Sequence, residues 1–352
     1  MEKNLTYSEQ VKIDNVLRLR EVLKTLPGFA KDYFRAIEPT TSTRTRISYA
    51  YDIRIFFQFL AAENPLFKDK DITTLKVDVL DQLQAVDIEE YQEYLKVYSD
   101  PENHIVTNGE RGLKRKMSAL RSFYAYYYKR EMIHTNPTLL VDMPKLHDKE
   151  IIRLDPDETA SLLDYIEHCG DSLTGQKKVY YEKTKVRDLA IVTLLLGTGI
   201  RVSECVGLDV NDIDFKNNGI RVVRKGGSEM MVYFGEEVEE ALRKYLEARK
   251  AITPVAGHEN ALFYSTQRRR IGVQAVENMV KKYAREVTTT KKITPHKLRS
   301  TYGTTLYRET GDIYLVADVL GHKDVNTTRK HYAAMGDDRR RTAASAVKLR
   351  KA

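Results

Sequence analysis

The segment Thr294-Pro295-His296-Lys297-Leu298-Arg299 opens the most informative part of this chain, and Leu320-Gly321-His322 and His331-Tyr332 follow it. The spacing of apolar residues predicts a helix over about 296–309. Within that helix His296 and Arg299 are three residues apart, and this spacing places both side chains on one helix face. The segment therefore predicts a helical fold that presents a histidine and an arginine side by side.

Two further cations lie upstream, where the chain turns. Arg201 follows the turn Gly197-Thr198-Gly199, at the end of an apolar helix over 187–197, and Lys225 lies in the turn between two predicted strands. A polar segment over 170–186 is predicted to be a surface loop. The strands are expected at 219–223 and 230–234, and helices from Val202 and at about 236–250, 273–286, 313–320, 325–333 and 338–350. The second half is thus predicted to be mainly helical, with a small antiparallel sheet.

The first half is also predicted to be helical. Helices are expected at about 10–26, 42–62, 87–98 and 111–130. Prolines and a polar run end this region, and Asp155-Pro156-Asp157-Glu158 is a typical helix start. We expect a helical N-terminal domain over 1–145, a linker over 146–155 and a second domain over 156–352.

Composition narrows the range of partners. The 352-residue chain has 58 Lys+Arg and 50 Asp+Glu, a net charge of +8, which makes a polyanion a plausible partner. Residues 1–145 hold 22 basic and 21 acidic residues, so the excess lies in the second half. The two cysteines give no disulfide framework or zinc spacing, and no apolar run is long enough to span a membrane. We expect a cytoplasmic protein without a membrane partner.

A cluster of basic residues occupies the first half of the predicted helix at 111–130. Such a cluster is either a solvated helix face or a face that lies in a DNA groove, where the cations neutralise phosphates. The sequence does not decide between these two interpretations. The candidate DNA-binding residues are Arg111, Lys114, Arg115, Lys116 and Arg121.

The cations of the second half form a set that suits attack on a phosphodiester. The transition state gains negative charge on the nonbridging oxygens, and the planar guanidinium groups of Arg201 and Arg299 match two oxygens at once. Preorganised positive donors of this kind usually make the largest contribution to rate enhancement. The sequence lacks the acidic cluster that holds paired magnesium ions in nucleases, so we expect no metal and no other cofactor.

The remaining residues supply a nucleophile and proton transfers. Tyr332 would attack phosphorus, and the phosphotyrosine bond would conserve the energy for rejoining without ATP. His296 is the candidate base, and His322 would donate a hydrogen bond to a phosphate oxygen. Lys225 would protonate the departing 5′ oxygen. Each residue alone has an ordinary structural explanation, but their occurrence together in this order indicates a catalytic site.

At these residues the chain resembles the tyrosine recombinases, the phage integrase family. The segment 198–204 resembles its first arginine box, with Glu204 in the place of the supporting acidic residue, and Arg224-Lys225-Gly226-Gly227 resembles its β-hairpin lysine motif. The segments 294–299 and 320–322 resemble its two histidine motifs, and Tyr332 its nucleophile. Ser300 stands where many members have histidine, and Arg224 where glycine is frequent. Within the family the chain most resembles the single-recombinase Xer proteins of Gram-positive bacteria, the XerS type.

The resemblance implies a two-domain DNA clamp. Its N-terminal region would be a core-binding (SAM-like) domain, and its second domain the catalytic domain, ending in a helix that docks into a neighbouring protomer. Two protomers would bind an inverted-repeat site in double-stranded DNA, and two such dimers would form a tetramer that exchanges strands through a Holliday junction. An accessory DNA translocase is a further partner expected for this type.

Three functions remain open from the sequence. The first is a recombinase that resolves chromosome dimers, and the second is an integrase or transposase of a mobile element with the same chemistry. The third is a DNA-binding protein without cleavage activity. The intact set of Arg201, Lys225, His296, Arg299, His322 and Tyr332 argues against the third.

Overall fold

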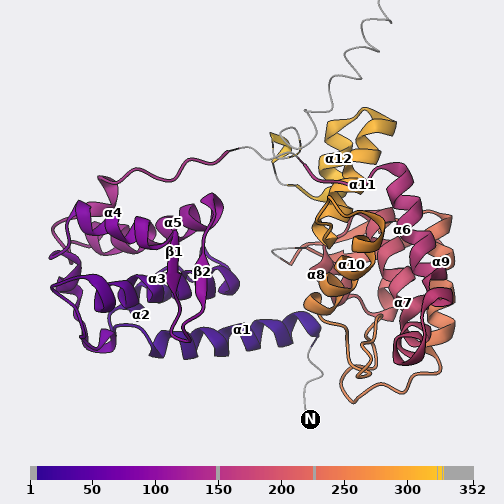
Figure 1. Cartoon of the computed structure of the whole chain (residues 1–352), viewed down its shortest axis with the longest axis horizontal. Helices are drawn as coiled ribbons and strands as arrows, with labels where there is room; N and C mark the ends of the chain where they lie inside the picture. Colours follow the sequence, from indigo (N-terminus) through magenta and orange to yellow (C-terminus); the bar gives the residue numbers. More distant parts are fainter. Residues whose placement is uncertain (1–5, 148–150, 225–226, 323, 327, 329–352) are drawn as a thin grey trace, which may run out of the picture. The chain divides into compact units, whose positions relative to one another are not determined.

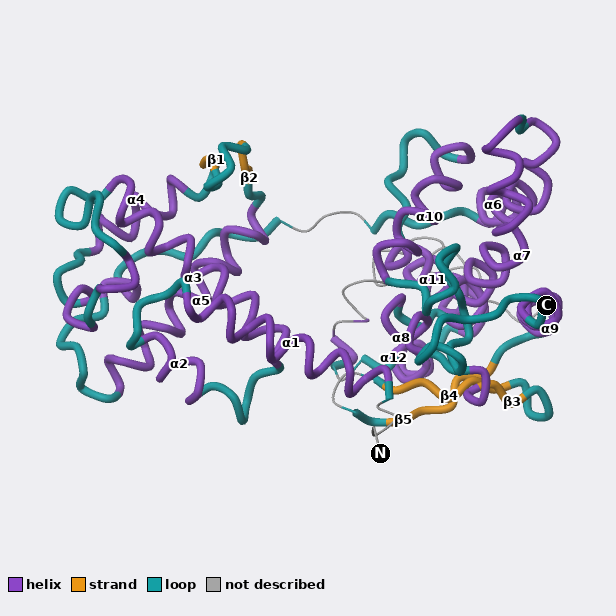
Figure 2. The backbone as a smooth tube through the Cα atoms, turned by 90° about the horizontal axis from the view of Figure 1, so that it is seen from below, coloured by secondary structure: helices purple, strands orange, loops and turns teal. Residues whose placement is uncertain are grey.

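The computed structural model describes residues 6–147, 151–224, 227–322, 324–326 and 328. The chain divides into two compact units, Met1–Lys149 and Glu150–Ala352. Both units consist mainly of helices, which confirms the predicted mainly helical class (Figure 1). Figure 2 shows the strands of the described residues as a short hairpin in the first unit and a small sheet in the second.

The first unit packs its helices around an aromatic core. Phe29, Phe57, Phe123 and Tyr127 make edge-to-face and tilted contacts with ring centroids 5.0–6.1 Å apart. The Tyr127 hydroxyl donates to the Phe29 carbonyl oxygen at 2.8 Å, so the buried phenol is satisfied. The elements are α1 (Tyr7–Lys24), α2 (Ala30–Ala36), α3 (Thr43–Glu63), η1 (Ile72–Thr74), η2 (Val77–Leu80), α4 (Ala85–Tyr94), β1 (Val97–Ser99), β2 (Ile105–Thr107), α5 (Glu110–Lys129) and η3 (Pro137–Leu139).

Local signals explain where these helices start. Thr6 and Glu9 form a capping box, in which the Glu9 carboxylate accepts the Thr6 N–H at 2.8 Å. Ser42 caps α3 by accepting the Thr45 N–H at 3.2 Å. The helices expected at 42–62 and 111–130 are confirmed within one residue at each end. The helix expected at about 87–98 is shorter, because the chain leaves α4 after Tyr94 and enters the β1–β2 hairpin.

The second unit is built around one long helix, α7. This helix packs against α6, α9 and α11, and most of its C-terminal half is buried, including Ile191, Leu194 and Leu195. Apolar residues thus face several sides of this half rather than one stripe, as expected of a central helix. The elements are α6 (Pro156–His168), η4 (Cys169–Ser172), α7 (Gly175–Thr198), α8 (Val202–Gly207), η5 (Val210–Asp212), β3 (Ile213–Asp214), β4 (Gly219–Val223), β5 (Glu229–Tyr233), α9 (Glu236–Arg249), α10 (Val273–Val287), α11 (Pro295–Thr310) and α12 (Ile313–Leu320).

The surface loop predicted over 170–186 is wrong for most of its length. Residues 175–186 form the first half of α7, and only the turn around η4 precedes it. Lys, Gln and Glu are common in exposed loops, but they also favour helices. A polar stretch at the exposed end of a long helix can therefore have the same composition as a loop. The helix expected at 338–350 lies outside the described residues. Of the helix expected at 325–333, only residues 325, 326 and 328 are described, and these three are helical.

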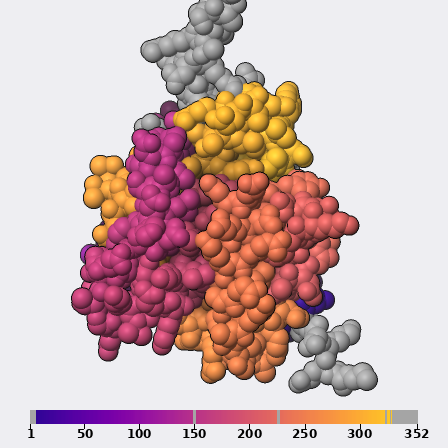
Figure 3. All heavy atoms as spheres, turned by 90° about the vertical axis from the view of Figure 1, so that its right-hand side faces the viewer, coloured from indigo at the N-terminus to yellow at the C-terminus, as the bar shows by residue number. Residues whose placement is uncertain are grey.

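The sheet and the start of the unit complete the frame. Strands β3, β4 and β5 are antiparallel in that order, with Ile220 opposite Val232 and both buried. The Leu154 N–H donates to the Thr301 hydroxyl at 3.0 Å, which fixes the chain before α6 against α11. In Figure 3 the corresponding start of the unit (magenta) adjoins the C-terminal helices (yellow).

Candidate active site

Arg201 lies in a tight turn between α7 and α8. Gly199 ends α7 in the left-handed conformation (φ 62°), and its N–H donates to the Leu195 carbonyl oxygen at 3.1 Å. A Cβ at this position would lie 2.4 Å from the Tyr302 ring, so both the backbone angle and the space require glycine. The turn delivers Arg201 as the N-cap residue of α8.

Glu204 fixes Arg201 through two hydrogen bonds. Its carboxylate accepts the Arg201 backbone N–H at 2.8 Å and the Arg201 Nη1 at 2.8 Å. The Glu204 side chain is 4% exposed, whereas that of Arg201 is 36% exposed. The buried carboxylate thus orients a guanidinium that stays accessible from solvent.

Arg299 joins three of the sequence motifs. It lies on α11 and is 4% exposed. Its Nη1 donates to the carbonyl oxygen of Gly199, and its Nη2 to that of Leu320. One side chain therefore holds together the turn before Arg201, the helix that carries His296 and the end of α12 before His322.

The two histidines lie at the ends of helices. His296 is exposed in the first turn of α11, one turn before Arg299. His322 is partly buried just after α12, and its backbone N–H donates to the Ala317 carbonyl oxygen at 2.9 Å. Its Nδ1 lies 2.7 Å from the hydroxyl of the buried Thr328, which orients the ring. Lys225 and Tyr332 lie outside the described residues.

Arg224 also belongs to this site, although it was expected only as a departure from a glycine. It is 9% exposed, and its Nη2 donates to the Val319 carbonyl oxygen at 2.7 Å. Burial holds the pKa of its guanidinium below the usual range; Glu204 opposes this shift and the nearby Arg201 adds to it. The sequence did mark this residue, because Arg224 stands where glycine is frequent, but it did not indicate that the side chain would bind the Val319 carbonyl.

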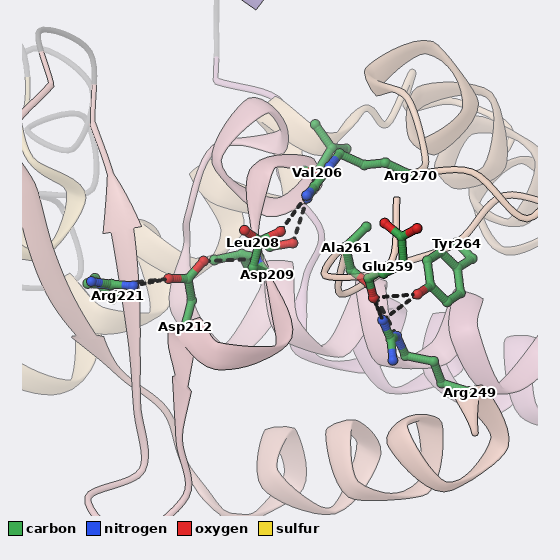
Figure 4. A network of polar contacts seen from close by, with 10 residues as sticks. All are labelled: Val206, Leu208, Asp209, Asp212, Arg221, Arg249, Glu259, Ala261, Tyr264 and Arg270. Carbon is green, nitrogen blue, oxygen red and sulfur yellow. Dashed lines mark hydrogen bonds and ion pairs between the residues drawn. The ribbon is translucent and has the colours of Figure 1, made fainter. Parts of the chain in front are cut away.

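A polar network holds the C-terminal end of α8 (Figure 4). Arg270 donates to the carbonyl oxygens of Val206 and Leu208, the latter at 2.7 Å, and pairs with Asp209. The Asp209 N–H donates to Asp212 at 2.8 Å, and Asp212 accepts two hydrogen bonds from Arg221 on β4. The segment that follows the first arginine box is therefore fixed to the sheet and to the loop before α10.

The candidate DNA-binding residues of α5 differ in their surroundings. Lys116 is buried and donates to Asn108 at 2.8 Å, and Arg121 donates to the Thr138 carbonyl oxygen at 3.0 Å. Arg115 pairs with the buried Asp52. These contacts give the three residues structural roles, which do not test their predicted contact with DNA. Arg111 is exposed and Lys114 partly exposed.

Neither a clustered metal site nor a membrane helix is found in the part of the chain that the structure describes. Among these residues no three or more His, Cys, Asp or Glu side chains gather so as to hold a metal ion. No helix of this part is long and apolar enough to cross a membrane.

The sequence matches the model of the phage integrase family over residues 153–339, more than half of the chain. "Tyrosine recombinase XerC" of Caldanaerobacter subterraneus subsp. tengcongensis is 33% identical over 340 residues, which cover 94% of this chain and 89% of that protein. "Tyrosine recombinase XerS" of Streptococcus uberis is 29% identical over 348 residues, covering 92% and 96%.

A solved structure shows the same fold. The XerH site-specific recombinase bound to its difH substrate is 19% identical, with a TM-score of 0.60 over 87% of this chain and 79% of that chain. The family match, the similarity to the relatives over nearly the whole chain and the assembled motifs agree. The chain belongs to the phage integrase family and is a tyrosine recombinase.

Proposed function

We propose that this enzyme cleaves and rejoins DNA at a specific site through a 3′-phosphotyrosine intermediate on Tyr332 and a Holliday junction. The observation that carries the proposal is the pair of hydrogen bonds from Arg299 to the carbonyls of Gly199 and Leu320. These bonds gather the arginine turn and both histidine motifs, which are distant in sequence, around one buried guanidinium. Such an arrangement suits a single phosphate group better than separate structural roles.

Arg201 and Arg299 would stabilise the charge that develops on the nonbridging oxygens. Arg201 is suited to this because Glu204 fixes its guanidinium before DNA arrives, so little reorganisation is needed. His322, oriented by Thr328, would donate to a phosphate oxygen. His296 would accept the proton of the Tyr332 hydroxyl, whose ordinary pKa of about 10 requires a base near neutral pH.

Lys225 would protonate the 5′ oxygen as it leaves. This role is testable with DNA that carries a bridging sulfur at the scissile 5′ position, because a thiolate leaves without a proton. Lys225→Ala is expected to cleave ordinary DNA slowly and the sulfur substrate at nearly the wild-type rate. A variant equally slow on both substrates would show that Lys225 is not the acid.

The first unit would be the core-binding domain and the second the catalytic domain. Arg111, Lys114 and Arg115 on α5 would contact DNA phosphates, together with Lys116 and Arg121 if DNA binding rearranges their present contacts. We expect two protomers on an inverted-repeat site, four in the complex of two sites, and an accessory DNA translocase. The solved structure of a lambda integrase dimer bound to a core site, 16% identical with a TM-score of 0.60, has the same fold.

The biological role proposed is the resolution of chromosome dimers. The support is the similarity to curated relatives named XerC and XerS, which extends over at least 90% of the chain. A plasmid with two directly repeated copies of the host's chromosomal recombination site is expected to be resolved into two circles. Resolution only of sites from a mobile element would assign the enzyme to that element instead.

Covalent trapping on a nicked suicide substrate tests the chemistry. The wild type is expected to form a protease-sensitive adduct with labelled DNA, and Tyr332→Phe to bind the same DNA without forming one. Tyr314→Phe is the matched control, since Tyr314 is 71% exposed on α12 and should leave adduct formation unchanged. Specific binding without an adduct in the wild type would favour a DNA-binding protein that does not cleave.

A further inference from the structure

Arg224 connects the base of the β4–β5 hairpin to the end of α12. Its backbone belongs to the hairpin: its N–H donates to the Ser228 carbonyl oxygen at 2.8 Å, and its own carbonyl accepts the Gly227 N–H at 2.9 Å. Its side chain leaves the hairpin and donates through Nη2 to the Val319 carbonyl oxygen at 2.7 Å. The two segments are 95 residues apart in sequence.

The guanidinium of Arg224 lies directly on Gly321. Gly321 ends α12 in the left-handed conformation (φ 59°). A Cβ built on it would lie 1.1 Å from Arg224 Nη1 and 2.3 Å from Cζ, so the arginine fills the space that any other side chain would need. Gly321 is therefore required by its backbone angle and, independently, by the presence of Arg224.

Two arginines share the end of α12. Arg224 binds the Val319 carbonyl, and Arg299 binds the carbonyl of the next residue, Leu320. The last carbonyls of a helix have no partner within the helix, and cations near its C-terminus are favourable. Since Arg299 already holds this end, losing Arg224 would release the hairpin rather than α12.

The contacts of Arg224 leave part of its guanidinium without hydrogen bonds. Within the described residues its Nε and Nη1 are buried and have no hydrogen-bond partner. A buried donor without a partner is unfavourable, and such groups in a native structure often mark a functional constraint. The geometry thus points to a role beyond stabilising the fold.

We propose that Arg224 is a positioning residue that, by fixing the hairpin to α12, limits where the following residue, Lys225, can lie during catalysis. Lys225 directly follows Arg224 in the sequence, so we expect the loss of the contact between Arg224 and α12 to impair the lysine. This inference rests on the general-acid role proposed above for Lys225. It gives a function to an arginine that a comparison of motifs alone would treat as a substitution for glycine.

The test compares Arg224→Ala with Lys225→Ala on ordinary DNA and on DNA with a 5′-bridging sulfur. Arg224→Ala is expected to cleave ordinary DNA about 10- to 100-fold more slowly, a part of what a general acid usually contributes. On the sulfur substrate its rate should return to within about 3-fold of the wild type, because the acid is no longer needed. Arg243→Ala on α9, which removes an ion pair with Glu239, is the matched arginine-to-alanine control and should cleave both substrates normally.

The outcomes separate the two proposals. If Lys225→Ala is rescued by sulfur but Arg224→Ala is not, Arg224 does not act through Lys225, and the positioning role is wrong. If Lys225→Ala is not rescued either, the acid role itself fails. A wild-type rate for Arg224→Ala on ordinary DNA would also overturn the positioning role.

A second comparison guards against a simple folding defect. Gly321→Ala should reduce cleavage strongly in the wild-type background, where the new methyl group displaces Arg224. In the Arg224→Ala background the same change should have a smaller effect, because only the backbone strain remains. Equal effects of Gly321→Ala in both backgrounds would show that the contact between Arg224 and Gly321 is not used.

Discussion

Replacing Glu204 by Gln tests how far the site depends on its buried carboxylate. Glu204 accepts two hydrogen bonds from Arg201, each of 2.8 Å, and its side chain is 4% exposed. A glutamine carbonyl can accept only part of this pair, and its NH2 group would face a donor. Hydrogen bonds to a buried charge contribute about 1.5–3 kcal/mol each, and the partly exposed Arg201 lowers the value for one of them, so we expect a loss of about 2–4 kcal/mol.

Urea unfolding followed by circular dichroism measures this loss, with the transitions of the two units fitted separately. Only the transition of the second unit should shift. Adduct formation on suicide DNA should slow by about 10- to 100-fold, because Arg201 is no longer preorganised. Glu240→Gln, which breaks an exposed pair with Lys244 on α9, should leave the unfolding transition almost unchanged, because solvent screens the pair. An equally small change for Glu204→Gln would refute the reasoning.

Three further predictions follow from backbone geometry and burial. Gly199→Ala should destabilise the second unit by about 2–5 kcal/mol, because backbone strain adds to the clash with Tyr302. Gly257→Ala (φ 83°), whose new methyl group would have no atom within 4 Å, should show the backbone strain alone, and equal shifts in melting temperature for the two variants would contradict this reasoning. Burial raises the pKa of Asp52 to about 6, so the folded state binds more protons than the unfolded chain between pH 4 and 6, and the stability of the first unit should fall as pH rises through this window. Urea titrations at several pH values measure this dependence, and Asp52→Asn should remove it. Burial also raises the pKa of the Cys205 thiol to about 12, so iodoacetamide should modify it only after unfolding, and rapid labelling of the native protein, read by mass spectrometry, would contradict its burial.

Much of the fold could be predicted from local signals. The apolar spacing over 42–62 predicted α3, and the sequence Asp155-Pro156-Asp157-Glu158 predicted the start of α6, where a capping box is found. The loop predicted at 170–186 failed because composition does not separate a polar helical turn from a loop. The β1–β2 hairpin was missed because its strands have three residues each, too few for a readable alternation.

The candidate site could be predicted as a set of residues but not as a geometry. The motif order indicated which side chains would matter, and Arg201 does pair with Glu204 three residues later. The contacts of Arg299 with the carbonyls of Gly199 and Leu320 depend on how three helices pack, and no local pattern encodes them. The partners of Arg224 were unpredictable for the same reason, since Val319 lies 95 residues away.

The reach of Arg299 has a consequence for the timing of synthesis. Arg299 and the Gly199 carbonyl that it binds are 100 residues apart, and Leu320 follows 21 residues later. A ribosome adds about 5–20 residues per second, so the turn that carries Arg201 waits about 5–20 s for the side chain that completes it. The first unit, which has its own aromatic core, can fold during this interval. A nascent chain can therefore complete its first unit before it forms the contacts that bring the arginine turn and both histidine motifs together.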